Sequence, residues 1–180
     1  MIDVKKNRSL KKWTFGELSI RVLWGLIYPI FYLSPRPFWS FRRFLLRIFG
    51  SSIGNNVHIY PTVRVMIPWN INIGDDSSVG DGVKLYALGP ITIGQRVTIS
   101  QGAHLCAGTH DYLDSTMPLI KCKITIESDV WICADAFVGP NVTIGVGAIL
   151  GARGVLFSDL PSKSIAWGNP AEIRKFRNIL

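Results

Sequence analysis

The sequence predicts a mainly β protein built as a parallel β-helix, in which short strands wind around one axis. Three observations carry this prediction. Aliphatic residues recur every six positions over residues 51–161, a small or acidic residue often follows the aliphatic, and a valine, alanine or serine often lies four positions after it. Neither a helical period nor strict alternation explains this pattern. A six-residue repeat is instead typical of a parallel β-helix.

Each repeat is expected to form one short strand and one corner, with the aliphatic side chain pointing inward. The residue after it is small because the chain turns there. Three repeats make a coil of 18 residues, and we expect about five coils. The predicted inward positions are Ile53, Ile59, Val65, Ile73, Val79, Leu85, Ile93, Ile99, Leu105, Ile126, Ile132, Val138, Ile144, Leu150 and Leu156.

Breaks in this register locate the irregular parts. Ile53 and Ile73 are 20 residues apart, as are Ile73 and Ile93, so each of these coils carries two extra residues. The step from Ile93 to Ile126 is 33 residues, which leaves about 15 inserted near Thr109–Lys123. A regular solenoid that admits one long loop usually does so for function.

Residues 1–50 differ from the rest and are expected to form a basic, aromatic-rich helical segment before the β-helix domain of residues 51–180. They hold ten Lys and Arg against two Asp and Glu, whereas residues 51–180 hold ten of each. The apolar run 22–33 is too short to span a bilayer, and Pro29 and the stretch 34–37 interrupt it. The tail 162–180 is expected to contain a short C-terminal helix.

The segment 38–49 has the pattern of an amphipathic helix. Phe38, Phe41, Phe44, Leu45, Ile48 and Phe49 share one face, and Arg42, Arg43 and Arg47 share the other. Two compatible interpretations stay open. The helix caps the open end of the β-helix, or it makes peripheral contact with an anionic membrane. The neutral body argues against nucleic-acid binding.

Cysteine use and the N-terminus indicate a cytoplasmic protein, and the segment 38–49 leaves a peripheral position at the inner face of the membrane as a second interpretation. Cys106, Cys122 and Cys133 fit no disulfide or zinc framework, which favours a reducing compartment. The basic N-terminus leads into an apolar run without a small-residue cleavage pattern, so no signal peptide is predicted.

Residues 51–180 resemble the hexapeptide-repeat acyltransferases, and most of all the colanic acid biosynthesis type of acetyltransferase. The repeats, the segment LCAGTHDY (105–112) and the tail WGNPA (167–171) carry the resemblance. It implies a left-handed coil, a homotrimer with active sites between subunits, and transfer of acetyl from acetyl-CoA to a sugar hydroxyl in surface polysaccharide biosynthesis, without a metal. Cys133 and His104 depart slightly from the family pattern.

Acetyl transfer needs a general base near the acceptor hydroxyl, and histidine is suited to that role near neutral pH. Of His58, His104 and His110, only His110 opens the insertion, and it matches the family's catalytic position. We expect His110 to be the base. The acceptor side is expected to include Asp81, Tyr86, Gln101, His104, Asp111 and Asp114, of which the last two are also candidates to orient His110.

The resemblance also suggests where acetyl-CoA binds. Main-chain groups of the last coils and a flanking indole are expected along the pantetheine arm, and cations are expected at the phosphates. The candidates are Trp131, Ala134, Gly151, Ala152, Arg153, Lys163, Arg174 and Lys175.

Four alternatives remain, and one of them is a different acyl donor, such as a longer acyl-CoA, which would need a wider cleft near Trp131. Cys106 has the residue type for a covalent acyl-enzyme, but it occupies the small-residue position after Leu105, which favours packing. A zinc carbonic anhydrase needs three converging imidazoles, whereas His104 and His110 are six residues apart and His58 lies more than two coils earlier. The main alternative is a non-catalytic scaffold or membrane-docking module.

Overall fold

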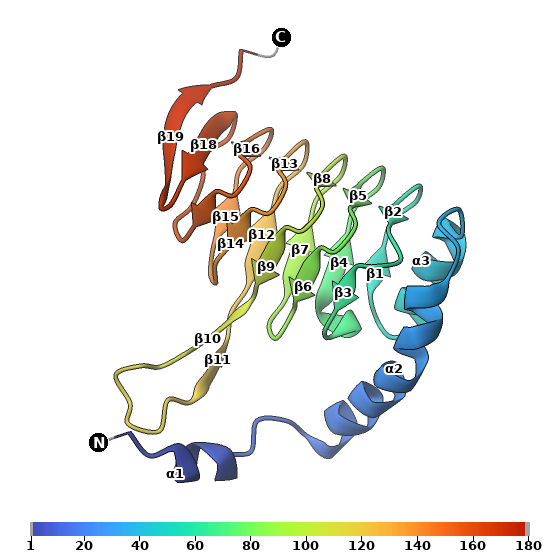
Figure 1. The fold of residues 1–180 in the computed structure, drawn as a ribbon, viewed down its shortest axis with the longest axis vertical. Helices are drawn as coiled ribbons and strands as arrows, with labels where there is room; N and C mark the ends of the chain where they lie inside the picture. The colour runs from blue at the N-terminus through green and yellow to red at the C-terminus, as the bar shows by residue number, and fades with distance from the viewer. Residues whose placement is uncertain (1, 179–180) are drawn as a thin grey trace.

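The structure is a computed structural model that describes residues 2–178. Its body is a left-handed parallel β-helix of five complete coils followed by a partial sixth (Figure 1). The predicted fold class is therefore confirmed. Helices lie at the N-terminal end of the coils, and a pair of longer strands lies at the C-terminal end.

Three sheets form the sides of the β-helix, and we name them sheets A, B and C. Sheet A contains β1 (Ser52–Ile53), β4 (Ile71–Ile73), β7 (Ile91–Ile93), β12 (Ile124–Ile126) and β15 (Thr143–Ile144). Sheet B contains β2 (His58–Ile59), β5 (Ser78–Val79), β8 (Thr98–Ile99), β13 (Trp131–Ile132), β16 (Ile149–Leu150), β18 (Ser164–Gly168) and β19 (Ala171–Phe176). Sheet C contains β3 (Arg64–Val65), β6 (Lys84–Tyr86), β9 (His104–Cys106), β14 (Phe137–Val138) and β17 (Val155–Leu156).

The core is a stack of the repeated aliphatic residues. All of the predicted inward positions are buried. In sheet A, for example, Ile53, Ile73, Ile93, Ile126 and Ile144 follow one another in register. Each burial stabilises the fold because it removes apolar surface from water, at about 25 cal/mol per Å².

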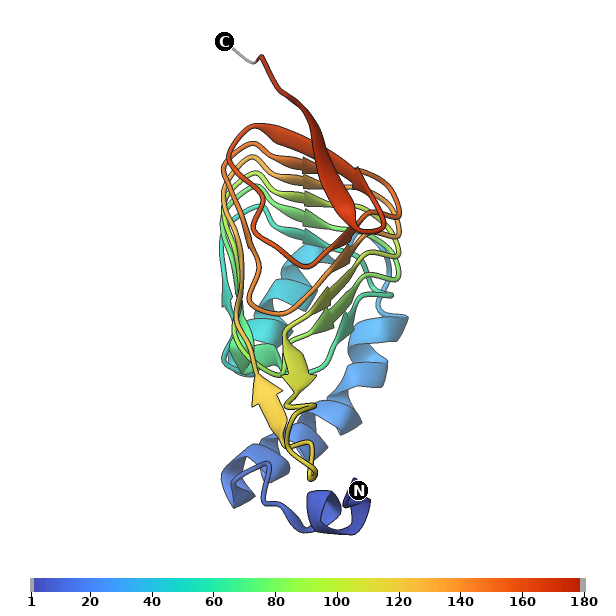
Figure 2. The ribbon, with the colours of Figure 1, turned by 90° about the vertical axis from the view of Figure 1, so that its left-hand side faces the viewer.

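The register breaks fall where the sequence placed them. Ile126 pairs directly with Ile93, so the intervening insertion leaves the coil and returns to it. The insertion contains an antiparallel hairpin of β10 (Gly108–His110) and β11 (Leu119–Lys121). In Figure 2 this hairpin projects away from the coils toward the N-terminal residues. The extra residues of the first coil form a short 3-10 turn, η1 (Pro68–Asn70).

The N-terminal segment forms α1 (Val4–Ser9), α2 (Phe15–Leu33) and α3 (Trp39–Ile48). Helix α2 is attached to the edge of the first coil, where Trp24 Nε1 donates to Val65 O at 2.8 Å and Tyr28 Oη donates to Val63 O at 3.3 Å. The expected break at Pro29 is wrong, since α2 continues through it. Burial of Trp24 and Phe31, one on each side of Pro29, holds both halves in place.

Helix α3 turns its arginines toward the coils. Arg42 is fully buried, and its guanidinium donates to Ser34 Oγ and Pro35 O at 2.8 Å each, as well as to Ile59 O and Arg36 O. Arg43 donates to Val57 O at 3.0 Å, and Arg47 donates to Ile53 O at 2.6 Å.

These contacts confirm the capping interpretation, because the first coil has no preceding coil to satisfy its carbonyls. They also show that all three guanidinium groups bond to the first coil, although the Arg47 side chain remains exposed. The exposed side of α3 instead carries apolar residues such as Phe44 and Ile48.

The predicted C-terminal helix is wrong. Residues Ala171–Phe176 form β19, which pairs antiparallel with β18 and ends sheet B. The sequence AEIRKF contains helix-favouring residues, but the free edge of β18 offers backbone hydrogen bonds that a helix cannot use. The last two residues of the predicted tail, 179–180, lie outside the described residues. The division into domains at residue 50 stays a prediction.

Candidate active site

His110 ends β10 and lies exposed on the projecting hairpin. Its Nδ1 is 2.7 Å from Met117 O, across the turn of the same hairpin. A carbonyl oxygen only accepts hydrogen bonds, so in the neutral form of the imidazole this contact places the ring proton on Nδ1. The Nε2 atom is then left with a lone pair, the state that a general base requires.

The hairpin tip is held by the N-terminal segment. The Asn7 amide donates to Thr116 O at 2.5 Å and to Met117 O at 2.7 Å. The Asp3 N–H donates to Ser115 O at 2.8 Å. Met117 O therefore accepts from both Asn7 and His110, and α1 helps to fix the carbonyl that orients the imidazole.

The two acids near His110 are used within the hairpin. Asp111 Oδ1 accepts from Leu113 N at 3.0 Å. Asp114 Oδ1 accepts from Thr116 N at 2.7 Å and from Thr116 Oγ1 at 2.8 Å, and these hydrogen bonds lower the pKa of its carboxyl. Within residues 2–178, no hydrogen bond joins either carboxylate to His110, so their expected orienting role is taken by Met117 O.

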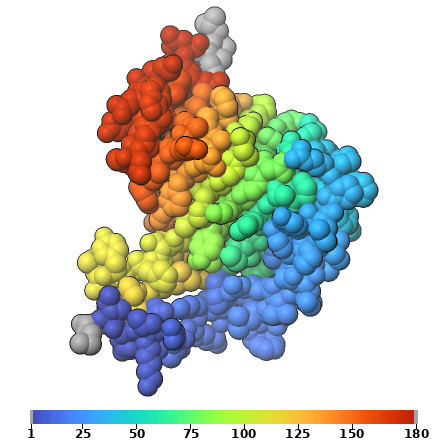
Figure 3. All heavy atoms as spheres, viewed as in Figure 1, coloured from blue at the N-terminus to red at the C-terminus, as the bar shows by residue number. Residues whose placement is uncertain are grey.

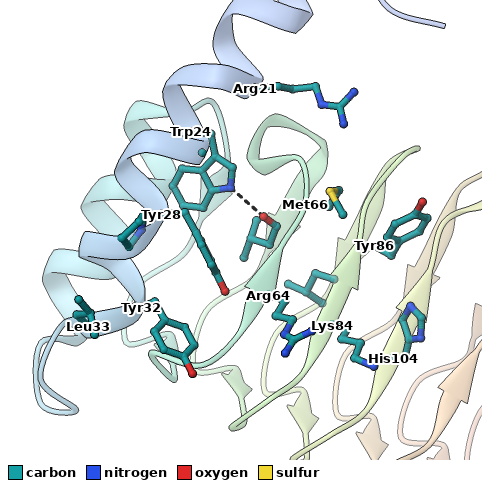
Figure 4. Close-up of a pocket in the computed structure, with 14 residues that line it drawn as sticks. Arg21, Trp24, Tyr28, Tyr32, Leu33, Arg64, Met66, Lys84, Tyr86 and His104 are labelled. Carbon is teal, nitrogen blue, oxygen red and sulfur yellow. Dashed lines mark hydrogen bonds between the residues drawn. The ribbon is translucent and has the colours of Figure 1, made fainter.

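A cleft of about 920 Å³ lies between α2 and the outer face of sheet C (Figure 4). Tyr86 and His104, both expected on the acceptor side, line it together. Arg64 and Lys84 stand beside them, because Arg64, Lys84 and His104 are in register on successive coils. Strand β9, which carries His104, leads directly into the hairpin that carries His110.

His104 forms a half-buried wall of this cleft. Its ring packs edge-on against Phe137, with centroids 5.3 Å apart, and its Nε2 is buried without a hydrogen-bond partner among the described residues. Burial, with a smaller contribution from Lys84, holds the pKa of His104 below its ordinary value of 6.5. The imidazole is therefore neutral in the folded protein at neutral pH.

We expect His104→Phe to flatten the dependence of stability on pH. The folded wild type resists a proton that its unfolded chain accepts, so its stability is full above about pH 6.5 and falls as the pH drops below that value. Phenylalanine keeps the packing and has no such proton. The measurement is the thermal midpoint between about pH 7 and 5 for both proteins. Parallel pH profiles for the two proteins would contradict this interpretation of His104.

A second group of predicted residues forms a column on the corner between sheets B and C. Backbone hydrogen bonds link successive coils there: Gly102 N to Asp81 O, Asp135 N to Gln101 O, and Arg153 N to Ala134 O, at 2.9 to 3.0 Å. Asp81 is further held by Arg36, and by Thr62 Oγ1 at 2.7 Å. The structure thus brings together four predicted residues: Asp81, Gln101, Ala134 and Arg153.

The other predicted CoA residues lie on sheet B and at its C-terminal end. Trp131 is about half exposed on β13, and its Nε1 donates to Ser100 Oγ at 2.9 Å. Gly151 and Ala152 follow β16 on the same corner as Arg153. Lys163 lies on the opposite corner, between sheets A and B, where its N–H donates to Val146 O at 2.8 Å. Arg174 and Lys175 lie on β19, with Arg174 paired to Glu172 at 3.0 Å.

The cysteines have the surroundings of packing residues. Burial raises the pKa of the Cys106 thiol, which disfavours the thiolate that nucleophilic catalysis needs. Burial raises the pKa of Cys133 in the same way. Both follow an inward aliphatic residue, as the repeat pattern predicted.

Several contributors to the site were missed by sequence reasoning. Met117 acts through its backbone carbonyl, for which no residue type is a signal. Asn7 is more than a hundred positions from the loop that it holds, and nothing in the sequence links them. Arg64 and Lys84 had a detectable signal, because both precede an inward aliphatic residue and must therefore point outward from sheet C.

Residues 2–178 contain no cluster of three or more His, Cys, Asp or Glu side chains suited to a metal ion. Among the same residues, no helix has both the length and the apolar character needed to cross a bilayer.

The chain is similar to proteins that transfer acetyl groups. No protein-family profile matches it. It is 41% identical over 162 residues to an Escherichia coli K12 protein named colanic acid biosynthesis acetyltransferase WcaF, which covers 90% of this chain and 89% of that protein. It is 27% identical over 135 residues to the galactoside O-acetyltransferase of the same organism, covering 73% and 66% of the two chains.

Solved structures agree. A hexapeptide-repeat acetyltransferase from Vibrio cholerae superposes with a TM-score of 0.84 at 26% identity, covering 91% of this chain and 93% of that one. The same Vibrio protein in complex with acetyl-CoA gives a TM-score of 0.82 at 25% identity, covering 95% and 94%. The coils and these relatives thus define an acetyltransferase of the hexapeptide-repeat class. The chain belongs to the acetyltransferases of the colanic acid biosynthesis type.

Proposed function

We propose that the protein transfers an acetyl group from acetyl-CoA to a sugar hydroxyl in surface polysaccharide biosynthesis, with His110 as general base. The observation that carries this proposal is the contact between His110 Nδ1 and Met117 O. It fixes the ring and leaves Nε2 to accept a proton. The relatives named galactoside O-acetyltransferase and colanic acid biosynthesis acetyltransferase support a sugar as the acceptor.

The proposed reaction is direct transfer in a ternary complex. His110 Nε2 takes the proton of the acceptor hydroxyl while that oxygen attacks the thioester carbonyl. The C–S bond then breaks, and the imidazolium returns its proton to the departing CoA sulfur. The raised pKa of Cys106 supports a route without an acyl-cysteine.

We propose that the active enzyme is a homotrimer whose sites lie between subunits. The positions of the predicted residues within one chain support this arrangement. His110 projects beyond the corner between sheets C and A, whereas Gln101, Ala134 and Arg153 stand on the corner between sheets B and C. The width of sheet C separates the two groups, so the hairpin of one subunit is well placed to meet the corner column of another.

Within this arrangement the two substrates approach from opposite ends of the coils. We propose that the acceptor binds near Tyr86 and His104, in the cleft beside the hairpin. Acetyl-CoA is placed along the corner of the later coils, with Trp131 near the thioester and Arg153 near the phosphates. The remaining predicted phosphate partners are Lys163, Arg174 and Lys175. Because acetyl-CoA is a cytoplasmic metabolite, we propose a cytoplasmic enzyme at the inner face of the membrane.

Binding of acetyl-CoA separates the enzyme from the alternative, a non-catalytic scaffold. Acetyl-CoA at 100 times its Kd should stabilise the folded protein by about 2.7 kcal/mol, because it binds only the folded state. The measurement is thermal unfolding with and without acetyl-CoA, followed by assay of CoA release with candidate sugars. A phosphate-free analogue such as pantetheine serves as the control. An unchanged melting temperature with acetyl-CoA would favour the scaffold.

A further inference from the structure

The outer side of α2 is an apolar strip that nothing covers in the described structure. Phe15, Leu26 and Leu33 are exposed by 84%, 70% and 78%. Each turn of α2 contributes an exposed apolar residue, so the strip runs the whole length of the helix. Its members, which we call the α2 strip, are Phe15, Leu18, Val22, Leu26, Ile30 and Leu33.

This strip is unusual because α2 is apolar on both sides. Trp24 and Phe31 are buried against the coils, and the opposite side is exposed yet equally apolar. Glu17 and Arg21 are the only charged residues among its 19. The exposed side of α3 also carries apolar residues, Phe44 and Ile48. A continuous apolar surface of this kind marks a docking site, since water is a poor partner for it.

The charges next to the strip indicate what covers it. Residues 2–12 hold five cations, which are Lys5, Lys6, Arg8, Lys11 and Lys12, against the single carboxylate of Asp3. Figures 1 and 3 show α1 and α2 along one edge of the molecule, with the coils on the other side. A basic segment beside an apolar helix matches an anionic lipid surface, where headgroups attract the cations and the acyl boundary accepts the apolar side chains.

We propose that the α2 strip docks on the surface of an anionic lipid bilayer, with α2 in the plane of the headgroups and the cations of residues 5–12 on the lipid phosphates. The contact differs from the one expected from the sequence. Arg42, Arg43 and Arg47 cap the first coil and take no part in it. An in-plane helix also agrees with the finding that no helix of residues 2–178 can span a membrane.

Docking in this orientation has a consequence for the site. Asn7, in α1, is bonded to the hairpin tip that orients His110, so the hairpin lies beside the docked edge. An acceptor carried by a membrane lipid would then reach His110 from the bilayer side. This consequence rests on the proposed function, whereas the docking itself does not.

The test measures binding of the full chain to phosphatidylcholine vesicles with and without phosphatidylglycerol, by sedimentation at low and high salt. Wild type should bind the anionic vesicles, and salt should weaken binding because it screens the cations. The combined variant Val22→Gln, Leu26→Gln, Ile30→Gln should bind about 10- to 100-fold more weakly. The variant Lys5→Gln, Lys6→Gln, Lys11→Gln should lose a similar factor on anionic vesicles alone. The matched control is Val146→Gln, Phe157→Gln, which changes exposed apolar residues on the later coils and should bind like wild type.

The same proteins are checked by light scattering and by their melting temperatures. Wild-type binding by the strip variant would overturn the proposal, as would equal binding of wild type to neutral and anionic vesicles. A change in oligomeric mass caused by the strip variant would also overturn it, because the strip would then belong to a contact between copies of this chain. None of these readouts uses acetyl-CoA, so failure of the proposed function would leave them unaffected.

Discussion

His110→Ala should reduce acetyl transfer by about 10²–10⁴-fold, the typical contribution of a general base. The oligomer and the affinity for acetyl-CoA should be unchanged, because the side chain is exposed and contacts only the carbonyl of Met117 within the described hairpin. The measurement is kcat with a sugar acceptor, together with the thermal shift produced by acetyl-CoA. A loss confined to kcat places His110 at the chemical step rather than in CoA binding.

Cys106→Ala is the matched control for this variant. Its thiol is partly buried and its pKa is raised, so direct transfer predicts nearly wild-type kcat for Cys106→Ala. If Cys106→Ala abolished transfer while His110→Ala remained active, the mechanism would pass through an acyl-cysteine, and the proposed role of His110 would be wrong.

Arg42→Ala should destabilise the fold by about 3–5 kcal/mol, a large fraction of a typical stability, through lost hydrogen bonds and lost packing. The guanidinium is fully buried and donates to three backbone carbonyls and one hydroxyl. Its removal leaves the buried acceptors Ile59 O and Ser34 Oγ without this donor and opens a cavity beneath α3. The measurement is the urea midpoint at fixed protein concentration, since oligomerisation shifts apparent stability.

Arg43→Ala provides the comparison on the same helix. Its guanidinium donates to Val57 O and Ser40 Oγ, but the side chain is only partly buried. Water can replace those donors, so we expect a cost of about 1 kcal/mol. Equal losses for the two variants would show that burial of Arg42 is not what stabilises the end of the coils.

The repeats were predictable because their geometry is set by local sequence. An inward residue such as Ile93 has a counterpart one coil away, and the spacing alone aligns the two. The insertion was predictable for the same reason, since the period resumes in register at Ile126. The wrong predictions of helices and strands arose where a contact with a distant segment determined the secondary structure.

Helix α3 shows the limit of periodicity. The pattern of residues 38–49 grouped the apolar residues on one face, but the structure divides that face: Leu45 and Phe49 pack against the core, whereas Phe44 and Ile48 are exposed. The usual rule places the apolar face inward, whereas the first coil presents carbonyls that require donors, and Arg42, Arg43 and Arg47 supply them. The strand β19 shows the same limit, because the free edge of β18 outweighed the local preference of AEIRKF for helix.

The sequence could predict which side chains form the candidate site, but not how they are oriented. His110 follows from the position of the insertion and from the resemblance. Its orientation depends on Met117 O and Asn7, which are a backbone atom and a residue of another segment. Whether the predicted acceptor and CoA residues bind their substrates stays a prediction.

The different closures at the two ends of the coils fix the length of the solenoid. Stacked coils are self-complementary along their axis, so an open end is a template on which another copy can grow, as in a filament. At one end the guanidinium groups of α3 occupy the carbonyls that an incoming chain needs. At the other end β19 runs antiparallel to β18 and breaks the parallel register. Head-to-tail polymerisation is thus blocked in a chemically different way at each end. If one end were opened by mutation, the other end would still be closed, and a second copy could not stack on it.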